Sequence, residues 1–183
     1  TMSGWLKDKN LNLNKRDRMY TLEQCLEQQK KVDASIKHEG TYLPWLAGIG
    51  EVIEMCEHLA LISTWKKQPE PDKKQAFMEL VDVFAFVLSN KNPYQCISPN
   101  KISETLEFCE ESSLTVVDII RRLIMNIASC DFNVCVGYLV GICDGYFKRD
   151  YGDIYYYYMG KQTLTRFRQA NGYKDGSYTK MWG

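Results

Sequence analysis

The sequence has few of the residues from which several common kinds of site are built. It contains only two histidines, His38 and His58, and its seven cysteines include no Cys-x-x-Cys pair. Because structural zinc is bound by sets of such residues, a zinc site is not expected. The odd number of cysteines, some inside apolar runs such as Val134-Cys135-Val136, instead favours buried free thiols in a reducing cytoplasm.

The chain also lacks a surplus of charge of either sign and any long hydrophobic run. Lys and Arg together number 23, as do Asp and Glu, so the formal net charge is zero. This balance does not indicate a nucleic-acid groove or a basic membrane surface. No apolar run approaches the ~18 residues of a membrane span, and residues 1–5 lack a signal-peptide pattern. We therefore expect no nucleic acid and no membrane as partners.

Helical periodicity dominates what is present. Hydrophobic residues make up 45% of the 183 residues, which suits one globular domain. Thr21-Leu-Glu-Gln24 has the spacing of a capping box and predicts the start of a helix. No segment shows convincing strand alternation, so the predicted fold class is all-α, a helical bundle. Further helices are expected over about 45–65, 72–90, 102–109, 114–130, 133–147 and 153–167, with Ser112 and Ser113 as cap candidates for the fifth helix from the start.

Two expected helices are apolar except for a pair of acidic residues in each. The pairs are Glu51-Val-Ile-Glu54 and Glu79-Leu-Val-Asp82. Residues three apart share a helix face, so two antiparallel helices can bring the pairs together. Such spacings are also common on solvated helix faces. However, the helix of Glu79 and Asp82 is apolar nearly all round, and a buried carboxylate needs a cationic partner or a metal. The same conflict on both helices indicates a functional site.

The type of ligand in this acidic cluster selects the metal. Oxygen ligands without His or Cys favour Mg²⁺ or Mn²⁺. Mg²⁺ commonly shares its remaining positions with water and substrate phosphates, whose charge four carboxylates alone would repel. The cluster therefore predicts phosphoryl chemistry with a metal-activated water. Glu51 and Glu54 are both candidates to orient or deprotonate that water, and the sequence does not separate them.

The acidic pairs belong to a longer pattern that resembles the dimeric dUTPases of kinetoplastids, some bacteria and phages, within the wider all-α NTP pyrophosphatase (MazG-like) group. The residues that carry it are Glu51-x-x-Glu54, Trp65-Lys66-Lys67 and the stretch from Glu79 to Ser89. The resemblance implies a homodimer that hydrolyses dUTP, and also dUDP, to dUMP by attack on the α-phosphate, releasing pyrophosphate from dUTP. It implies two or three Mg²⁺ ions, replaceable by Mn²⁺, on Glu51, Glu54, Glu79 and Asp82.

Two further stretches narrow the resemblance. Leu26 to Asp33 resembles the motif in which a Gln and a following Asn or Asp contact the uracil, which implies Gln29 and Asp33 here, with Trp65 as a wall for the ring. A polar helix face and ordinary Trp packing are the alternative interpretations. Gly160 to Trp182 resembles the C-terminal motif that closes over the nucleotide. Its expected phosphate contacts are Lys161, Arg168, Tyr173 and Lys174, and the alternative is a basic, solvated tail.

The resemblance also sets the expected domain organisation. It implies a single helical catalytic domain over 21–168 and a tail over 169–183 that closes over the nucleotide, and the polar, Asn- and Lys-rich composition of residues 1–20 predicts a loosely ordered lead-in. Three positions depart from the family pattern. Ala85 stands where the kinetoplastid-like pattern often has His, and Gln162 and Thr165 replace two Asn of the C-terminal motif. The Thr165 substitution puts one nucleotide contact in doubt.

Two alternative functions remain open at this stage. One is a broader house-cleaning pyrophosphatase of the same fold that acts on dCTP or modified nucleotides. The other is a phage-type dUTPase that also binds a regulatory protein, a repressor, for which the polar stretch 90–113 is the place to look. Apolar surface near Tyr138 and Ile142 would permit the homodimer that the family implies.

Overall fold

The computed structural model describes residues 20–36, 40–62 and 70–171. Within these ranges the chain forms α-helices and no strands, which confirms the predicted all-α fold. None of these helices is both long and apolar enough to cross a membrane. The helices are α2 (Leu22–Ser35), α3 (Pro44–His58), α4 (Lys73–Ser89), α5 (Pro99–Glu111), α6 (Val116–Ala128), α7 (Phe132–Gly145) and α8 (Tyr151–Ala170).

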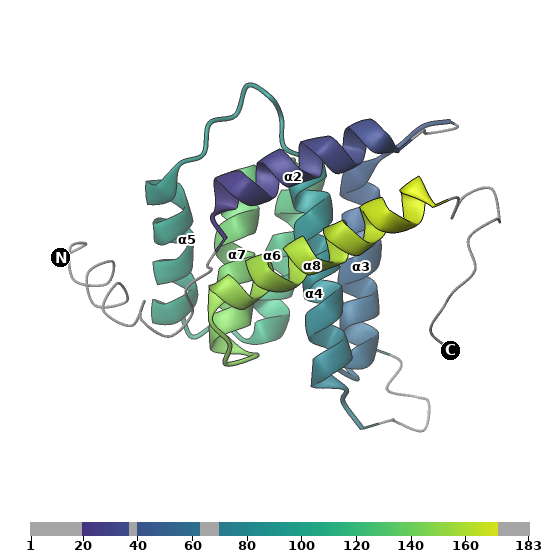
Figure 1. Cartoon of the computed structure of the whole chain (residues 1–183). Helices are drawn as coiled ribbons and strands as arrows, with labels where there is room; N and C mark the ends of the chain where they lie inside the picture. Colours follow the sequence, from purple (N-terminus) through teal and green to yellow (C-terminus); the bar gives the residue numbers. More distant parts are fainter. Residues whose placement is uncertain (1–19, 37–39, 63–69, 172–183) are drawn as a thin grey trace, which may run out of the picture.

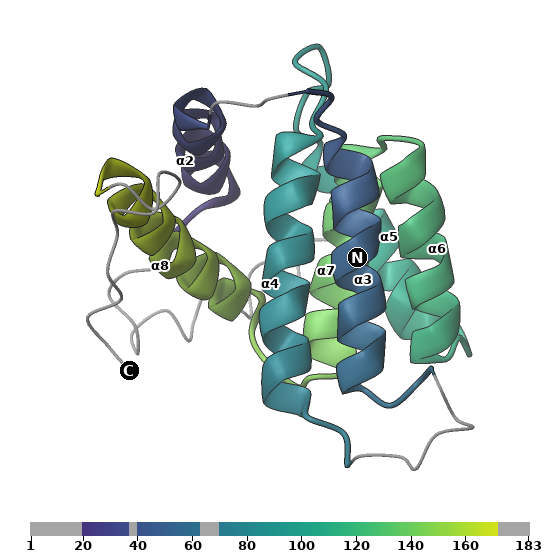
Figure 2. The same cartoon turned by 90° about the vertical axis from the view of Figure 1, so that its right-hand side faces the viewer.

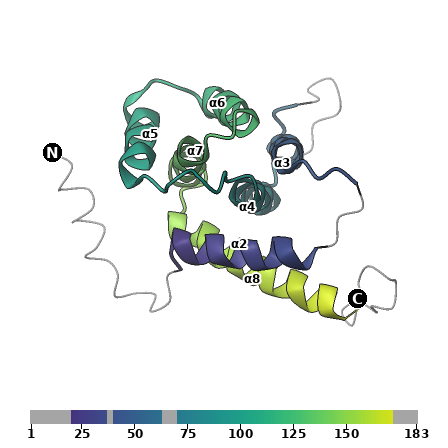
Figure 3. The same ribbon diagram turned by 90° about the horizontal axis from the view of Figure 1, so that it is seen from above.

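The helices are arranged in two layers (Figure 1). Figure 3 shows α3, α4, α5, α6 and α7 nearly end-on as a bundle, whereas α2 and α8 lie lengthwise beside one another across it. The crossing pair packs mainly on α4, which in turn packs along α3 (Figure 2). As a result α4 lies between the other helices of the bundle and the crossing pair, and it packs on both α3 and α8.

Aromatic packing fixes where α8 crosses α4. The ring of Phe84 on α4 stacks on Tyr155 with centroids 5.4 Å apart and meets the edge of Tyr158 at 5.3 Å. Each such pair contributes about 0.5–1.5 kcal/mol beyond the burial of its area. Because all three rings are buried, they hold one face of α8 against α4.

The helix α7 lies inside the bundle rather than at its surface. At Gly137 an added Cβ would lie 2.5 Å from the Cβ of Thr105, so α5 approaches α7 too closely for any side chain there. Tyr138 and Ile142 are 6% and 1% exposed. The expectation that they offer apolar surface for a dimer is therefore wrong, because α4, α5 and α6 cover α7.

Several helix boundaries differ from the sequence predictions; α5 and α8 are longer at both ends than the expected 102–109 and 153–167, and two further differences have a clear local cause. The helix expected over 45–65 ends at His58, because Ala60 adopts a left-handed φ of 54° and the N–H of Leu61 turns back to the carbonyl of Cys56 at 3.0 Å. The left-handed residue that ends a helix in this way is usually glycine, whereas here it is alanine. The helix expected from residue 114 starts at Val116, capped by Thr115 and not by either serine.

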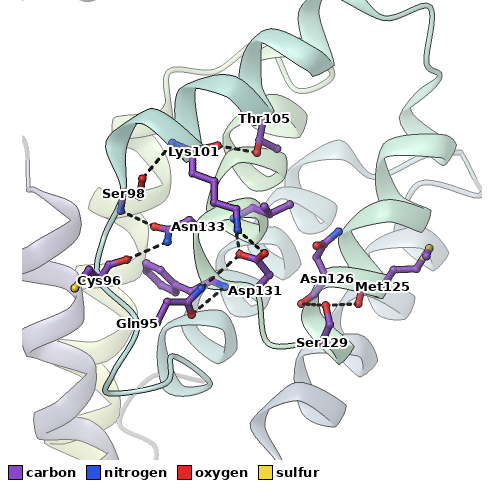
Figure 4. Close-up of polar contacts among 12 residues, drawn as sticks. Gln95, Cys96, Ser98, Lys101, Thr105, Met125, Asn126, Ser129, Asp131 and Asn133 are labelled. Carbon is purple, nitrogen blue, oxygen red and sulfur yellow. Dashed lines mark hydrogen bonds and ion pairs between the residues drawn. The ribbon is translucent and has the colours of Figure 1, made fainter.

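Figure 4 shows how the connection between α4 and α5 is held against the start of α7. The N–H of Ser98 donates to Oδ1 of Asn133 at 2.8 Å, and Nδ2 of Asn133 donates to the carbonyl of Cys96 at 3.0 Å. Lys101 forms an ion pair of 2.7 Å with Asp131, which caps α7. These contacts hold residues 96–101 against the N-terminal end of α7, and each neutral hydrogen bond contributes about 0.5–1.5 kcal/mol.

Candidate active site

Carboxylates from two adjacent helices meet on the side of the bundle that α8 crosses. Glu51 comes from α3, Glu79 and Asp82 come from α4, and one oxygen of each lies within 4.8 Å of the others. Glu79 is 7% exposed, whereas the other two are half-buried. The structure thus brings together three of the four acidic residues that the sequence singled out.

The fourth acidic residue, Glu54, lies outside this group. It is exposed to solvent, although it follows Glu51 on the same helix by less than one turn. Residues three apart on an α-helix differ by about 60° in direction, so only one of the two can point straight at α4. Its part in metal binding stays a prediction.

Crowding of negative charge alters the acidity of the cluster. Burial raises the pKa of Glu51 to about 7, and the charges of Asp82, Glu54 and Glu79 add to this, against the opposing effect of Lys161. Burial likewise raises the pKa of Asp82, whereas its hydrogen bond and ion pair with Lys161 act in the opposite direction. Closely packed carboxylates of this kind form a site that a cation would stabilise.

The raised pKa of Glu51 predicts that stability depends on pH and metal together. Between its ordinary value of 4.5 and about 7, Glu51 keeps its proton in the folded protein and loses it in the unfolded chain. The metal-free protein should therefore become less stable as pH rises through this window. After allowance for solvent screening, we expect about 1 kcal/mol, or roughly 2–4 °C in Tm.

Thermal unfolding at both ends of this window, with chelator or with Mg²⁺, measures the effect. Metal binding needs the deprotonated carboxylate, so the rise in Tm with Mg²⁺ should be larger at the upper end. Glu51→Gln is the control, because it removes the titrating group and should flatten the profile. An identical pH profile in the variant and the wild type would show that Glu51 is not the group responsible.

Two polar side chains that sequence reasoning missed contact the most buried carboxylate. Nε2 of Gln75 donates to Oε1 of Glu79 at 2.7 Å, and Nε2 of His58 lies 3.7 Å from the same oxygen. Helical spacing was the available signal, since Gln75 precedes Glu79 by four residues and His58 follows Glu51 by seven. Both side chains restrict where the Glu79 carboxylate can point.

Of the residues predicted to bind phosphate, the structure places Lys161 and Arg168 on α8. The ammonium of Lys161 pairs with Asp82, so this cation sits at the carboxylate cluster itself. Arg168 is half-buried seven residues further on, which places it two turns along the same face. Trp65, Tyr173 and Lys174 lie outside the described residues. The three departures from the family pattern are all in the described part, with Gln162 buried and Ala85 and Thr165 half-buried.

The two predicted base contacts lie together on α2 and meet the C-terminal end of α4. Nε2 of Gln29 donates to Oδ1 of Asp33 at 2.8 Å and to Oγ of Ser89 at 2.9 Å. Ser89 in turn donates to Oδ1 of Asp33 at 2.8 Å. On the other side, the phenol of Tyr158 donates to Oε1 of Gln29 at 2.7 Å. The sequence analysis assigned no role to Ser89 or Tyr158.

The carboxylate cluster and the Gln29–Asp33 pair lie along one strip of α4. Gln75, Glu79, Asp82 and Ser89 follow one another at intervals of four, three and seven residues, which keeps them on one helix face. Asp82 and Ser89 are separated by roughly 10 Å of helix. A mononucleotide spans a comparable length from its α-phosphate to the edge of its base, so one end of the strip suits phosphates and the other suits a base.

A helical fold that gathers carboxylates from two adjacent helices beside such a strip defines the class of the protein, an all-α nucleotide pyrophosphatase. The particular family follows from a comparison with known families. The profile described as dUTPase matches residues 21–173, so the chain belongs to the all-α dUTPase family and is a dUTP pyrophosphatase. This confirms the family, fold class and activity predicted from sequence. No curated protein matches the chain at a significant level.

Proposed function

We propose that the protein hydrolyses dUTP to dUMP and pyrophosphate with Mg²⁺ held at Glu51, Glu79 and Asp82, beside Glu54. The observation that carries this proposal is the convergence of three carboxylates within 4.8 Å of one another. Their donor set consists of oxygen atoms alone, which suits Mg²⁺ and also Mn²⁺. The pKa of Glu51 is raised first by burial and then by the neighbouring carboxylates, whose negative charge divalent cations, two or three in number by family resemblance, would neutralise.

The side chains of the site then have distinct tasks in an in-line attack of water on the α-phosphorus. Mg²⁺, when bound, supplies charge neutralisation at the phosphates and makes nearby water more acidic. Glu51 accepts the proton of the attacking water, because its half-buried carboxylate lies in the cluster that would hold the metal. Lys161 stabilises the negative charge that develops on the phosphates. The bond to the bridging oxygen breaks and pyrophosphate leaves.

The substrate contacts beyond the cluster are also part of this proposal. Asp33, with Gln29 behind it, reads the uracil, and Trp65 forms a wall of the base site by family resemblance. Arg168, Tyr173 and Lys174 follow Lys161 as phosphate contacts of the C-terminal segment, again by resemblance. The position of Asp33 at the far end of the α4 strip from Asp82 supports the assignment of the base to this end.

Pyrophosphate release from dUTP, dCTP and dTTP, assayed in parallel with Mg²⁺ and with excess chelator, tests the proposal. We expect Mg²⁺-dependent turnover of dUTP, and kcat/KM for dCTP lower by about a hundredfold or more, because a mismatched hydrogen-bonding edge is rejected strongly. Turnover that survives the chelator would contradict the metal site. Equal turnover of dCTP would instead make the protein a broader pyrophosphatase. Release of phosphate from dUDP is expected in the same assay.

The homodimer and the cytoplasmic location stay predictions. Apolar side chains exposed on the adjacent helices α3 and α6, among them Leu46, Ile53, Val117 and Met125, support a dimer contact there in place of the buried α7. Burial raises the pKa of Cys25, Cys135 and Cys143 to about 12, which supports inert thiols in a reducing compartment. Nothing in residues 90–113, which form α5 and an anchored connection, favours a regulatory partner.

A further inference from the structure

The hydrogen bonds around Gln29 all run in one direction, toward Asp33. The Tyr158 phenol donates its one proton to Gln29, both Nε2 protons of Gln29 go to Asp33 and Ser89, and the Ser89 hydroxyl donates to Asp33. An amide nitrogen has two protons and a hydroxyl has one. These three side chains therefore have no donor left for a ligand, and the chain of bonds ends on a carboxylate, which can only accept.

Asp33 and Tyr158 hold the Gln29 amide in one orientation from its two ends. With the amide reversed, its oxygen would face the Asp33 carboxylate and its nitrogen would face Tyr158. The backbone carbonyl of Cys25 is a second, more distant acceptor at 3.2 Å, so Gln29 Oε1 at 2.7 Å is the main partner of the phenol proton. Tyr158 is fully buried against Phe84, and burial raises its pKa, so it stays protonated.

Asp33 is the member of this network that remains accessible. It is half-buried, whereas Gln29 is 5% exposed. Oδ1 of Asp33 accepts bonds from Gln29 and Ser89, and Oδ2 accepts a longer contact of 3.0 Å from the same Ser89 hydroxyl. A carboxylate has about four lone-pair positions, so acceptor capacity is left over on Oδ2. Tyr42, half-buried beside Ser89 and Asp33, lies at the same end of the site.

At N3, uracil and cytosine offer opposite groups to this acceptor, and cytosine can satisfy the carboxylate only by a shift that brings its N4 amino group to it. Uracil carries a proton on N3 between two carbonyl oxygens, whereas N3 of cytosine carries a lone pair. The N3–H of uracil can donate to Oδ2 of Asp33, but cytosine would place a lone pair against a carboxylate. Two acceptors that face each other without a proton between them, here N3 of cytosine and Oδ2 of Asp33, are costly. Thymine has the same N3–H as uracil, so this contact does not exclude dTTP.

We propose that Tyr158 and Ser89 are positioning residues for base selection, which hold Gln29 so that Asp33 presents only an acceptor to N3 of the base. The inference rests on the proposed function, in which Asp33 contacts the uracil. It adds the reason why the contact favours uracil over cytosine, and it assigns that preference partly to two residues that do not touch the nucleotide.

Steady-state kcat and KM for dUTP and dCTP in Tyr158→Phe and Ser89→Ala test the proposal. Each variant removes one hydroxyl that holds the Gln29 amide or the Asp33 carboxylate, so the carboxylate is positioned less firmly toward N3 of the base. We expect the preference for dUTP over dCTP to fall by about tenfold in each variant, mainly through a higher KM for dUTP. Ser89→Thr keeps the hydroxyl and should keep the preference.

Tyr155→Phe is the matched control for the tyrosine. Tyr155 is also buried on α8 and also packs on Phe84, but its hydroxyl is not part of this chain of bonds. The control should therefore keep the wild-type preference. Thermal unfolding of each variant identifies any loss of fold. If Tyr158→Phe and Ser89→Ala lower kcat equally for both substrates and leave the preference unchanged, their role is structural only and the proposal is overturned.

Asp33→Ala separates this inference from the function on which it rests. If it leaves both constants for dUTP unchanged, Asp33 does not contact the base, and the base assignment falls together with the positioning role. If it weakens dUTP binding and lowers the preference while the Tyr158 and Ser89 variants do not, the base assignment stands and only the positioning role is overturned. A drop in preference in all three variants, with the control unchanged, supports both.

Discussion

Glu51→Gln is expected to lower kcat for dUTP by about a thousandfold, within the 10²–10⁴ range typical for loss of a general base. The substitution keeps the shape of the side chain but removes a proton acceptor and one of the three clustered carboxylates. Glu54→Gln should cost about tenfold or less, because Glu54 is exposed and lies outside that group. Pyrophosphate release in saturating Mg²⁺ measures both variants, which differ only in position on α3.

Stability should move in the opposite direction to activity in the Glu51 variant. Burial and like charges oppose the ionised form of Glu51, so a neutral Gln should leave the metal-free protein at least as stable as wild type at neutral pH. A folded, inactive Glu51→Gln with normal or raised Tm would therefore show a local effect on chemistry. Greater damage from Glu54→Gln than from Glu51→Gln would transfer the proton-accepting role to Glu54.

Lys161→Met is expected to lower kcat/KM for dUTP by about a hundredfold, the size of effect seen when one group that stabilises transition-state charge is removed. Lys161 also lowers the pKa of both Glu51 and Asp82. Without it, these pKa values rise further, and a base that must be deprotonated reaches its active form only at higher pH. The acidic limb of the pH profile of kcat/KM should therefore move upward.

The pH profile distinguishes two ways in which Lys161 can act. A lower rate together with a shifted acidic limb indicates that Lys161 sets the charge of the carboxylate cluster as well as binding phosphate. A lower rate with an unshifted limb would contradict the electrostatic role and leave only the phosphate contact. Lys74→Met is a suitable control, because Lys74 is an exposed lysine in the first turn of α4, away from the cluster.

The acidic cluster was predictable because carboxylates at helical spacing interrupted an apolar helix, and burial without a cation would be too costly. The direction of Glu54 was not predictable, since spacing fixes which residues share a face but not how far the helix is rotated toward its neighbour. The early end of α3 was missed because Ala60, with no glycine to signal it, adopts a left-handed backbone conformation.

The hydrogen-bond network around Gln29 and Asp33 could not be predicted from sequence patterns, for a different reason. Tyr158 and Gln29 lie 129 positions apart in the chain and meet only because α2 and α8 cross the bundle side by side. Periodicity within one helix carries no information about such a crossing. The wrong expectation for Tyr138 and Ile142 has a related cause, since a helix covered on several sides has no face left for a partner.

The strip on α4 also has a consequence for which part of the substrate is recognised. One rigid helix separates Asp82 from Ser89, so under the proposed function the site would fix the distance between the α-phosphate and the base. That distance is the same in dUDP and dUTP, and also in the product dUMP. We therefore infer that α4 selects the half of the substrate that survives the reaction, and that the phosphates beyond the α-position serve as an interchangeable leaving group.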